Sequence, residues 1–149
     1  MNTEKDRTPV GLLLVVEDSK SDVRLLNESF RESGAVVHST VVEDGEEAMA
    51  YLRRQGKFAD APRPDLVLLD LNLPRKDGPD VLLEIKSDPH LKRIPVVVLT
   101  TSAAEEDVSR CYDLGANCYV VKPLDLDEYI RTTRALAEFW FTVVRFAET

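Results

Sequence analysis

The chain has 149 residues, of which 44% are hydrophobic and 31% charged, and its net charge is −8. This length and composition fit one soluble globular domain with an ordinary core. The acidic balance argues against a protein that binds nucleic acid through phosphate contacts and against docking on an anionic membrane. No signal peptide or transmembrane run is present, so we predict a cytoplasmic protein that binds neither nucleic acid nor membrane.

The chain contains two cysteines, Cys111 and Cys118, and two histidines, His38 and His90. The cysteine spacing matches no metal site, and neither histidine is placed to complete one. We interpret the cysteines as reduced thiols, although their spacing alone also permits a disulfide. We interpret both histidines as surface residues.

Short apolar runs alternate with amphipathic segments five times along the chain. The apolar runs predict strands over residues 12–16, 36–42, 65–70, 94–100 and 118–121. Helices are expected between Ser19 and Gly34, from Asp44 to about Gln55, over 77–87, over about 103–114, and from Asp125 to about Val144. Pairs of capping side chains three residues apart are predicted at the helix starts Ser19/Asp22, Asp44/Glu47, Ser102/Glu105 and Asp125/Glu128. This alternation predicts an α/β fold with a parallel sheet covered by helices on both faces.

Polar side chains lie at the carboxyl ends of four of the five predicted strands. Glu17 and Asp18 follow the first strand, Asp70 and Thr100 are the last residues of the third and fourth, and Lys122 follows the fifth. Because the carboxyl ends of parallel strands lie at one edge of a sheet, where open α/β sheets bind their ligands, these groups are expected to converge. Taken alone, Asp70 would be interpreted as a solvated acid at a strand end; the other four residues favour a site.

Carboxylates gathered in this way repel one another unless a cation lies between them. Hard oxygen ligands without sulfur or imidazole suit Mg²⁺ rather than zinc. A carboxylate can also attack phosphorus and form an aspartyl phosphate. Phosphoryl transfer depends mainly on positioning and charge neutralisation, which Mg²⁺, the Lys122 ammonium and the Thr100 hydroxyl would supply.

Over residues 12–136 the sequence resembles the receiver domain of two-component response regulators, the CheY-like family. The resemblance rests on five elements in order, which are Glu17-Asp18, Asp70 with Asn72, Pro74 and Asp77-Gly78, Thr100, and Tyr119-Val120-Val121-Lys122-Pro123. It implies a flavodoxin-like doubly wound (βα)5 fold with five parallel strands in the order 2-1-3-4-5. Residues 11–138 would form this domain, after a flexible arm at 1–10 and before an apolar extension of the last helix at 139–149.

The resemblance also implies a role for each site residue. Asp70 would accept the phosphoryl group. The Mg²⁺ ligands would be Asp18, Asp70, the Asn72 carbonyl and Glu17, the last directly or through water.

The remaining residues would respond to the phosphoryl group. Lys122 would pair with it, and the peptide bond between Lys122 and Pro123 would be cis. Thr100 would move to hydrogen-bond a phosphoryl oxygen, and Tyr119 would swing inward with it as the second switch residue. Taken singly, Thr100 could equally be a helix cap and Tyr119 a half-buried surface aromatic.

These roles imply a single-domain response regulator, which takes its phosphoryl group from a separate histidine kinase and signals through protein contacts. It would not be a classical enzyme, although it would catalyse its own phosphotransfer and dephosphorylation. The alternative within the family is a relay that passes the phosphoryl group to a histidine phosphotransfer protein.

The end of the chain is unusually apolar for a free terminus. Residues 139–146 read FWFTVVRF, and these apolar side chains cannot all face the same core. An exposed apolar surface usually marks an interface, so we predict a homodimer through the last helix and tail, with kinase docking as the alternative. The tail, the turn at residues 71–78 and the loop at 55–64 are also similar to stand-alone regulators that partner bacterial and cyanobacterial phytochromes. That likeness implies a phytochrome-type kinase as phosphodonor.

Three hypotheses from other functional classes compete with a response regulator. A phosphatase of the haloacid dehalogenase type also uses a strand-end Asp, but it needs a second Asp where this chain has Asn72. A flavodoxin-like cofactor binder would need a phosphate loop after the first strand, where Glu17 and Asp18 would repel phosphate. A scaffold that works without phosphorylation would not require the acidic site.

Overall fold

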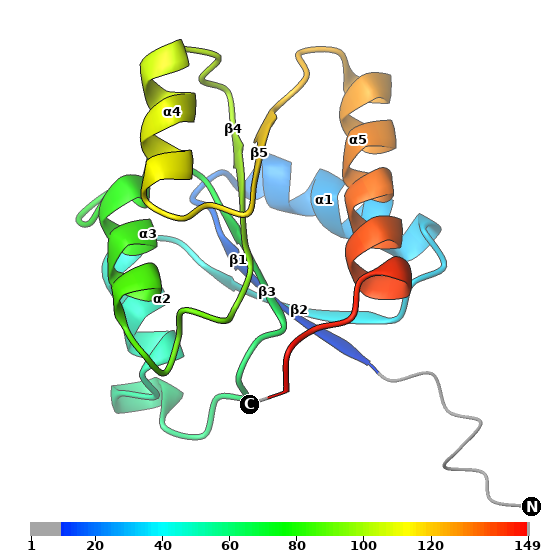
Figure 1. Cartoon of the computed structure of the whole chain (residues 1–149). Helices are drawn as coiled ribbons and strands as arrows, with labels where there is room; N and C mark the ends of the chain where they lie inside the picture. Colours follow the sequence, from blue (N-terminus) through cyan, green and yellow to red (C-terminus); the bar gives the residue numbers. More distant parts are fainter. Residues whose placement is uncertain (1–9, 149) are drawn as a thin grey trace, which may run out of the picture.

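The computed structural model describes residues 10–148, in which five strands alternate with five α-helices (Figure 1). In chain order the elements are β1 Gly11–Val16, α1 Lys20–Glu32, β2 Val37–Val42, α2 Gly45–Leu52, β3 Leu66–Leu69, α3 Gly78–Ser87, β4 Val96–Thr100, α4 Glu105–Asp113, β5 Cys118–Val121 and α5 Leu126–Glu138. A 3₁₀ turn (η2, Gly56–Phe58) follows α2, and a π-helical turn (η3, Phe139–Val143) follows α5. All but Val10 of the expected N-terminal arm lies outside the described residues.

All five strands are parallel, and their order in the sheet is β2-β1-β3-β4-β5, as predicted. Strand β3 is central and pairs with β1 on one side and β4 on the other, with Leu69 opposite Val16 and Val98. The four residues of β3 are all buried, which is why this run contains no polar side chain. Asp70 directly follows β3 and therefore lies in the middle of the carboxyl edge.

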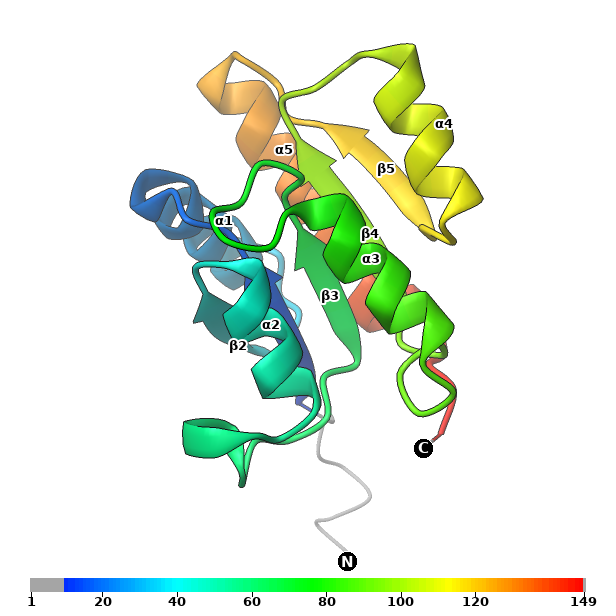
Figure 2. The ribbon, with the colours of Figure 1, turned by 90° about the vertical axis from the view of Figure 1, so that its left-hand side faces the viewer.

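Helices cover both faces of the sheet (Figures 1 and 2). Helices α2, α3 and α4 lie on one face, and α1 and α5 pack together on the other. Because successive side chains of a strand point to opposite faces, Leu14 and Val16 belong to one core cluster while Leu13 and Val15 belong to the other. Within residues 10–148, no helix is long and apolar enough to cross a membrane.

Three of the four predicted capping pairs are confirmed. The backbone N–H of Asp22 donates to Ser19 Oγ at 3.3 Å, that of Glu47 to Asp44 Oδ1 at 2.8 Å, and that of Glu128 to Asp125 Oδ2 at 3.0 Å. The predicted cap at Ser102 is wrong, because α4 begins after Ala104 and has no side-chain cap. The Ser102 hydroxyl instead donates to Asp107 Oδ2 at 2.5 Å, in the first turn of α4, and accepts from the backbone N–H of Ala104 at 3.3 Å.

The two cysteines are free thiols. Cys111 belongs to the core cluster under α2, α3 and α4, whereas Cys118 packs against the cluster on the opposite face of the sheet. The sheet therefore separates the two sulfur atoms, and the disulfide that their spacing permitted is not formed. Burial raises the pKa of both thiols, which keeps them protonated. His38 and His90 are exposed, as expected.

The apolar tail divides its side chains between the core and solvent. The π-helical turn η3 places Trp140 in the core, where it is 9% exposed, and Phe141, Val144 and Phe146 pack against the same cluster. Phe146 stacks on Trp140, with ring centroids 6.4 Å apart. Phe139 and Val143 face solvent. Most of the tail's apolar surface is thus covered by the chain's own α1–α5 face.

Candidate phosphoacceptor and metal site

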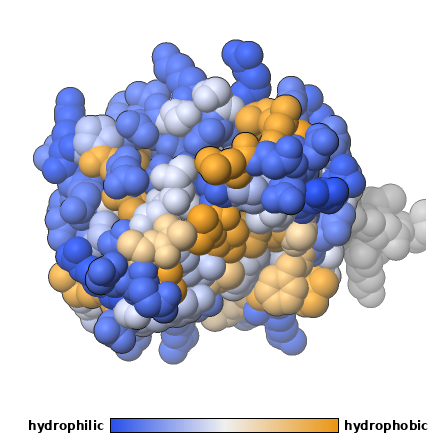
Figure 3. Space-filling model, turned by 90° about the horizontal axis from the view of Figure 1, so that it is seen from above, coloured by the Kyte–Doolittle hydropathy of each residue, from blue (hydrophilic) through white to orange (hydrophobic). Residues whose placement is uncertain are grey.

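Three carboxylates meet at the carboxyl edge of the sheet. One carboxylate oxygen each from Glu17, Asp18 and Asp70 lies within 4.8 Å of the other two. Glu17 and Asp70 are buried, with exposures of 7% and 9%, while Asp18 is exposed. The site therefore opens toward solvent on the side of Asp18. Seen from above in Figure 3, hydrophilic side chains occupy much of the outline of the molecule, and apolar groups gather toward the middle and right of the view.

Lys122 reaches this cluster from the end of β5. Its ammonium donates to three carboxylates, which are Glu17 Oε1 at 2.5 Å, Asp22 Oδ2 at 2.8 Å and Asp70 Oδ2 at 3.2 Å. Its side chain is only 7% exposed. An ammonium group has three protons, so each of them has a carboxylate acceptor. The convergence of Glu17, Asp70 and Lys122 that the sequence predicts is therefore present.

Two buried carboxyl groups, Glu17 and Asp70, share one buried ammonium, Lys122, and this imbalance affects the pKa values of the site. Burial raises the pKa of the Glu17 carboxyl to about 7; Asp70 adds to the rise, and the hydrogen bond from Lys122 opposes it. Burial alone would lower the pKa of Lys122, but its hydrogen bonds to Asp22 and Glu17 outweigh burial and raise that pKa. The ammonium is therefore held in its charged form. A divalent cation between the carboxylates would favour their ionised forms in the same way.

Thr100 ends β4 beside the site. Its side chain is fully buried, and its Oγ1 has no hydrogen-bond partner among residues 10–148. The backbone N–H of Lys122 donates to the Thr100 carbonyl at 2.6 Å, which ties the ends of β4 and β5 together. A buried hydroxyl without a hydrogen-bond partner costs free energy, so packing alone does not explain why position 100 holds a threonine.

We expect Thr100→Val to raise the free energy of unfolding by about 1 kcal/mol, because it removes an unpaired buried hydroxyl with little change of shape. Urea denaturation followed by circular dichroism measures the change. Thr133 is the control. Its side chain is as buried as that of Thr100, but its Oγ1 has a hydrogen-bond partner, the Tyr129 carbonyl at 2.8 Å. Thr133→Val should bring no gain; an equal gain in both variants would show that the Thr100 hydroxyl is not the cause.

Asn72 and Tyr119 lie around the same edge. The backbone N–H of Asn72 donates to Asp70 Oδ1 at 3.3 Å, and its side chain is exposed. The Tyr119 hydroxyl donates to the Ser102 carbonyl at 2.9 Å, from a half-buried position. Burial raises the pKa of the Tyr119 hydroxyl, which keeps it a hydrogen-bond donor.

The turn between β3 and α3 packs tightly against Asp70. A methyl group in place of the Gly78 hydrogen would lie 2.5 Å from both the Asp70 carbonyl oxygen and the Leu71 Cα, so only glycine permits this approach. Arg75 takes a left-handed conformation in the turn, with φ of 66°, and its Nε lies 3.7 Å from Asp44 Oδ2.

The predicted cis peptide bond between Lys122 and Pro123 is wrong for this structure, since every peptide bond in residues 10–148 is trans. Trans is the favoured form of most bonds that precede proline.

Sequence reasoning missed two residues of the site. It interpreted Asp22 only as a helix-capping partner, but this carboxylate is an acceptor for Lys122. It attached no role to Tyr129, which is 5% exposed and donates to the Asp22 carbonyl at 3.3 Å. The signal that could have found Asp22 is its position in the first turn of the helix that follows Glu17-Asp18, since that turn starts at the carboxyl edge.

Comparison with known proteins agrees with this geometry. A model of the response regulator receiver domain matches residues 13–134. The chain belongs to the response regulator receiver family. Response regulator Rcp1 of Synechocystis sp. is 47% identical to this receiver over 139 residues, which make up 93% of this chain and 95% of Rcp1.

Two solved structures are similar throughout the receiver. The phosphorylated cyanobacterial phytochrome response regulator RcpA is 48% identical with a TM-score of 0.90, covering 94% of this chain and all of the RcpA chain. The Mn²⁺-bound form of Rcp1 is 46% identical with a TM-score of 0.89, covering 93% of this chain and 99% of the other. The flavodoxin-like fold inferred from the resemblance is therefore confirmed. Family membership also favours a signalling protein over the phosphatase and the cofactor binder.

Proposed function

We propose that this receiver accepts a phosphoryl group on Asp70 in a reaction that depends on a divalent cation. The observation that carries the proposal is that one buried carboxylate, Asp70, lies among two further acids, a buried ammonium and the unpaired buried hydroxyl of Thr100. One Asp70 oxygen would form a bond to phosphorus as the P–N bond of a phosphohistidine breaks. The departing imidazole nitrogen keeps the electron pair and takes a proton.

Glu17, Asp18 and Asp70, with the Asn72 carbonyl, would hold the cation, which we propose is Mg²⁺. Their donor set fits, because it consists of oxygen atoms alone and carries an excess of negative charge. When bound, the cation would neutralise charge on the transferring group. The Mn²⁺-bound form of Rcp1 supports a divalent cation in the corresponding fold.

Lys122 and Thr100 would recognise the product. Phosphorylation turns one negative charge into roughly two and adds acceptor oxygens. Lys122 already lies 3.2 Å from Asp70 Oδ2, and the Thr100 hydroxyl has a proton to donate. The new contacts would shift the population toward a second conformation, in which Tyr119 moves inward from Ser102.

The donor would be a sensor histidine kinase, and we propose one of the phytochrome type. The 48% sequence identity to RcpA, a phytochrome response regulator, supports this partner.

The homodimer through the last helix and tail stays a prediction. Phe139 and Val143 are the large apolar side chains of η3 that remain exposed for it. A relay to a second histidine is the alternative route for the phosphoryl group.

Acetyl phosphate with Mg²⁺ is expected to add one phosphoryl group to the protein, and EDTA is expected to prevent it. Intact-protein mass spectrometry measures the labelled fraction. Zn²⁺ should replace Mg²⁺ poorly, because the site offers neither sulfur nor imidazole. Labelling that continues undiminished in EDTA would contradict the proposed metal requirement, and no labelling with Mg²⁺ would contradict the proposed acceptor function.

A further inference from the structure

The Lys122 ammonium is shared between two sides of the site. Glu17 and Asp70 belong to the acidic cluster, whereas Asp22 approaches from the first turn of α1. The contact to Asp22 is shorter than that to the acceptor, at 2.8 Å against 3.2 Å. Because all three ammonium protons have acceptors, a phosphoryl oxygen on Asp70 can bind Lys122 only by displacing or sharing one of them.

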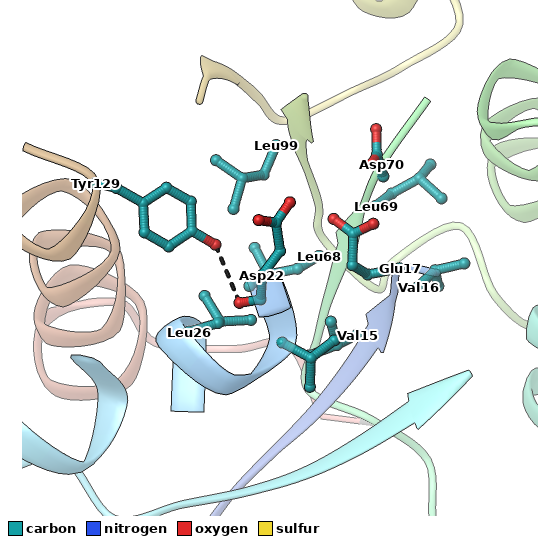
Figure 4. A pocket seen from close by; sticks show the side chains of 11 residues that line it. Val15, Val16, Glu17, Asp22, Leu26, Leu68, Leu69, Asp70, Leu99 and Tyr129 are labelled. Atoms are coloured by element: carbon teal, nitrogen blue, oxygen red, sulfur yellow. Dashed lines mark hydrogen bonds between the residues drawn. The ribbon is translucent and has the colours of Figure 1, made fainter. Parts of the chain in front are cut away.

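Asp22 is held in place from both ends of its backbone. Its N–H donates to Ser19 Oγ at 3.3 Å, and its carbonyl accepts from the Tyr129 hydroxyl at 3.3 Å. Tyr129 belongs to α5 and is buried, so this bond fixes the first turn of α1 against α5. Figure 4 shows this bond, with the carboxylates of Asp22 and Glu17 close together and Asp70 beyond them.

The surroundings of these groups strengthen their electrostatic interaction. A small cavity beneath them is lined by Glu17, Asp22 and Asp70 and otherwise mainly by apolar side chains, among them Leu26, Leu68 and Leu99. Charges interact more strongly beside apolar walls than in water, so the Asp22 carboxylate acts on Lys122 with little screening on this side.

We propose that Asp22 is a positioning residue that restrains Lys122 in the unphosphorylated state and competes with the phosphoryl group for its ammonium. This inference rests on the proposed function of Asp70. Asparagine at position 22 keeps the shape and one acceptor oxygen but loses the charge. The hydrogen bond between residue 22 and the Lys122 ammonium becomes weaker, because its acceptor is no longer charged. The ammonium is then more available to a phosphoryl oxygen. The same change removes one negative charge that repels the phosphoryl group.

Beryllium fluoride, which mimics a phosphoryl group on a carboxylate, tests this with saturating Mg²⁺. Isothermal titration calorimetry gives its affinity for the wild type, Asp22→Asn and Glu28→Gln. Glu28 is an exposed acid on the same helix, so the control changes net charge equally without touching Lys122. We expect Asp22→Asn to bind about fivefold more tightly than the wild type, and Glu28→Gln to bind like the wild type.

Urea denaturation of the same variants without beryllium fluoride separates positioning from folding. A purely structural role for Asp22 would change the urea midpoint and leave the affinity of the folded protein as in the wild type, which overturns the proposal. Equal or weaker binding by Asp22→Asn also overturns it. Asp70→Asn should not bind at all; a wild type that fails to bind would overturn the proposed function itself, and this inference with it.

Discussion

Asp70→Asn is expected to abolish phosphoryl labelling by acetyl phosphate. The amide that replaces the carboxylate is a poor nucleophile toward phosphorus, and it removes one charge from the acidic cluster that would hold the cation. Of the two other carboxylates in the cluster, Asp18 is exposed, and Glu17 accepts the shorter bond from Lys122, at 2.5 Å against 3.2 Å for Asp70. The labelled fraction should fall below detection under conditions that label the wild type.

The variant should remain folded, which makes its loss of labelling interpretable. Glu17, Asp22 and Asp70 share one buried ammonium, so neutral asparagine relieves repulsion between like charges. Its urea midpoint should equal or exceed that of the wild type. Glu43→Gln is the matched control, because Glu43 is an exposed acid directly after β2 at the same edge of the sheet. It should be labelled like the wild type, and equal labelling of Asp70→Asn would show that the acceptor is another residue.

Trp140→Ala is expected to lower the free energy of unfolding by about 3–5 kcal/mol. Trp140 is 9% exposed and packs in the cluster that joins α1, α5 and the sheet. Removing the ring would leave a cavity beside Phe146, which stacks on it, and would loosen the tail. Urea denaturation followed by circular dichroism gives the change, since the variant has no tryptophan left for fluorescence.

The neighbouring residue provides the control. Phe139 is 52% exposed, and its ring lies 5.6 Å from that of Trp140. Phe139→Ala should cost less than about 1 kcal/mol, because surface substitutions remove little buried area. Phe146→Ala keeps Trp140. The fluorescence of Trp140 should shift to the red, because its indole ring becomes exposed when Phe146 is removed. Equal losses from Phe139→Ala and Trp140→Ala would show that the tail does not pack as described.

These variants also separate two roles of the tail. Deleting residues 140–149 would disturb the core as well as any dimer, because Trp140 and Phe146 pack against the chain's own sheet face. Phe139→Ala removes exposed apolar surface without opening the core. If the tail mediates a homodimer, light scattering should show a lower mass for Phe139→Ala while its stability stays close to that of the wild type.

The sequence alone was sufficient to predict the sheet and the convergence at its edge. The buried runs ending in Val16, Leu69 and Thr100 are continuous because both faces of the sheet are covered, and this pattern indicates parallel strands. Parallel strands bring their carboxyl ends to one edge, so the sequence alone predicts that Asp70, Thr100 and Lys122 lie close together. Strand ends were predicted within two residues, because the runs end in charged or turn-forming residues.

Only the tertiary structure decided how individual side chains pair. Asp22 had a sufficient local explanation as a helix-capping partner, so its contact with Lys122, 100 residues away, could not be derived from spacing. The predicted Ser102 cap was wrong because α4 starts two residues later than expected, with Ala104 at the N-cap, so the Ser102 hydroxyl accepts from the Ala104 N–H instead. The division of the tail into buried Trp140 and exposed Phe139 depends on which side of η3 packs against the sheet and helices α1 and α5. Local patterns determine elements and their order, whereas the partner of a buried charge depends on which distant groups the packed helices bring within reach.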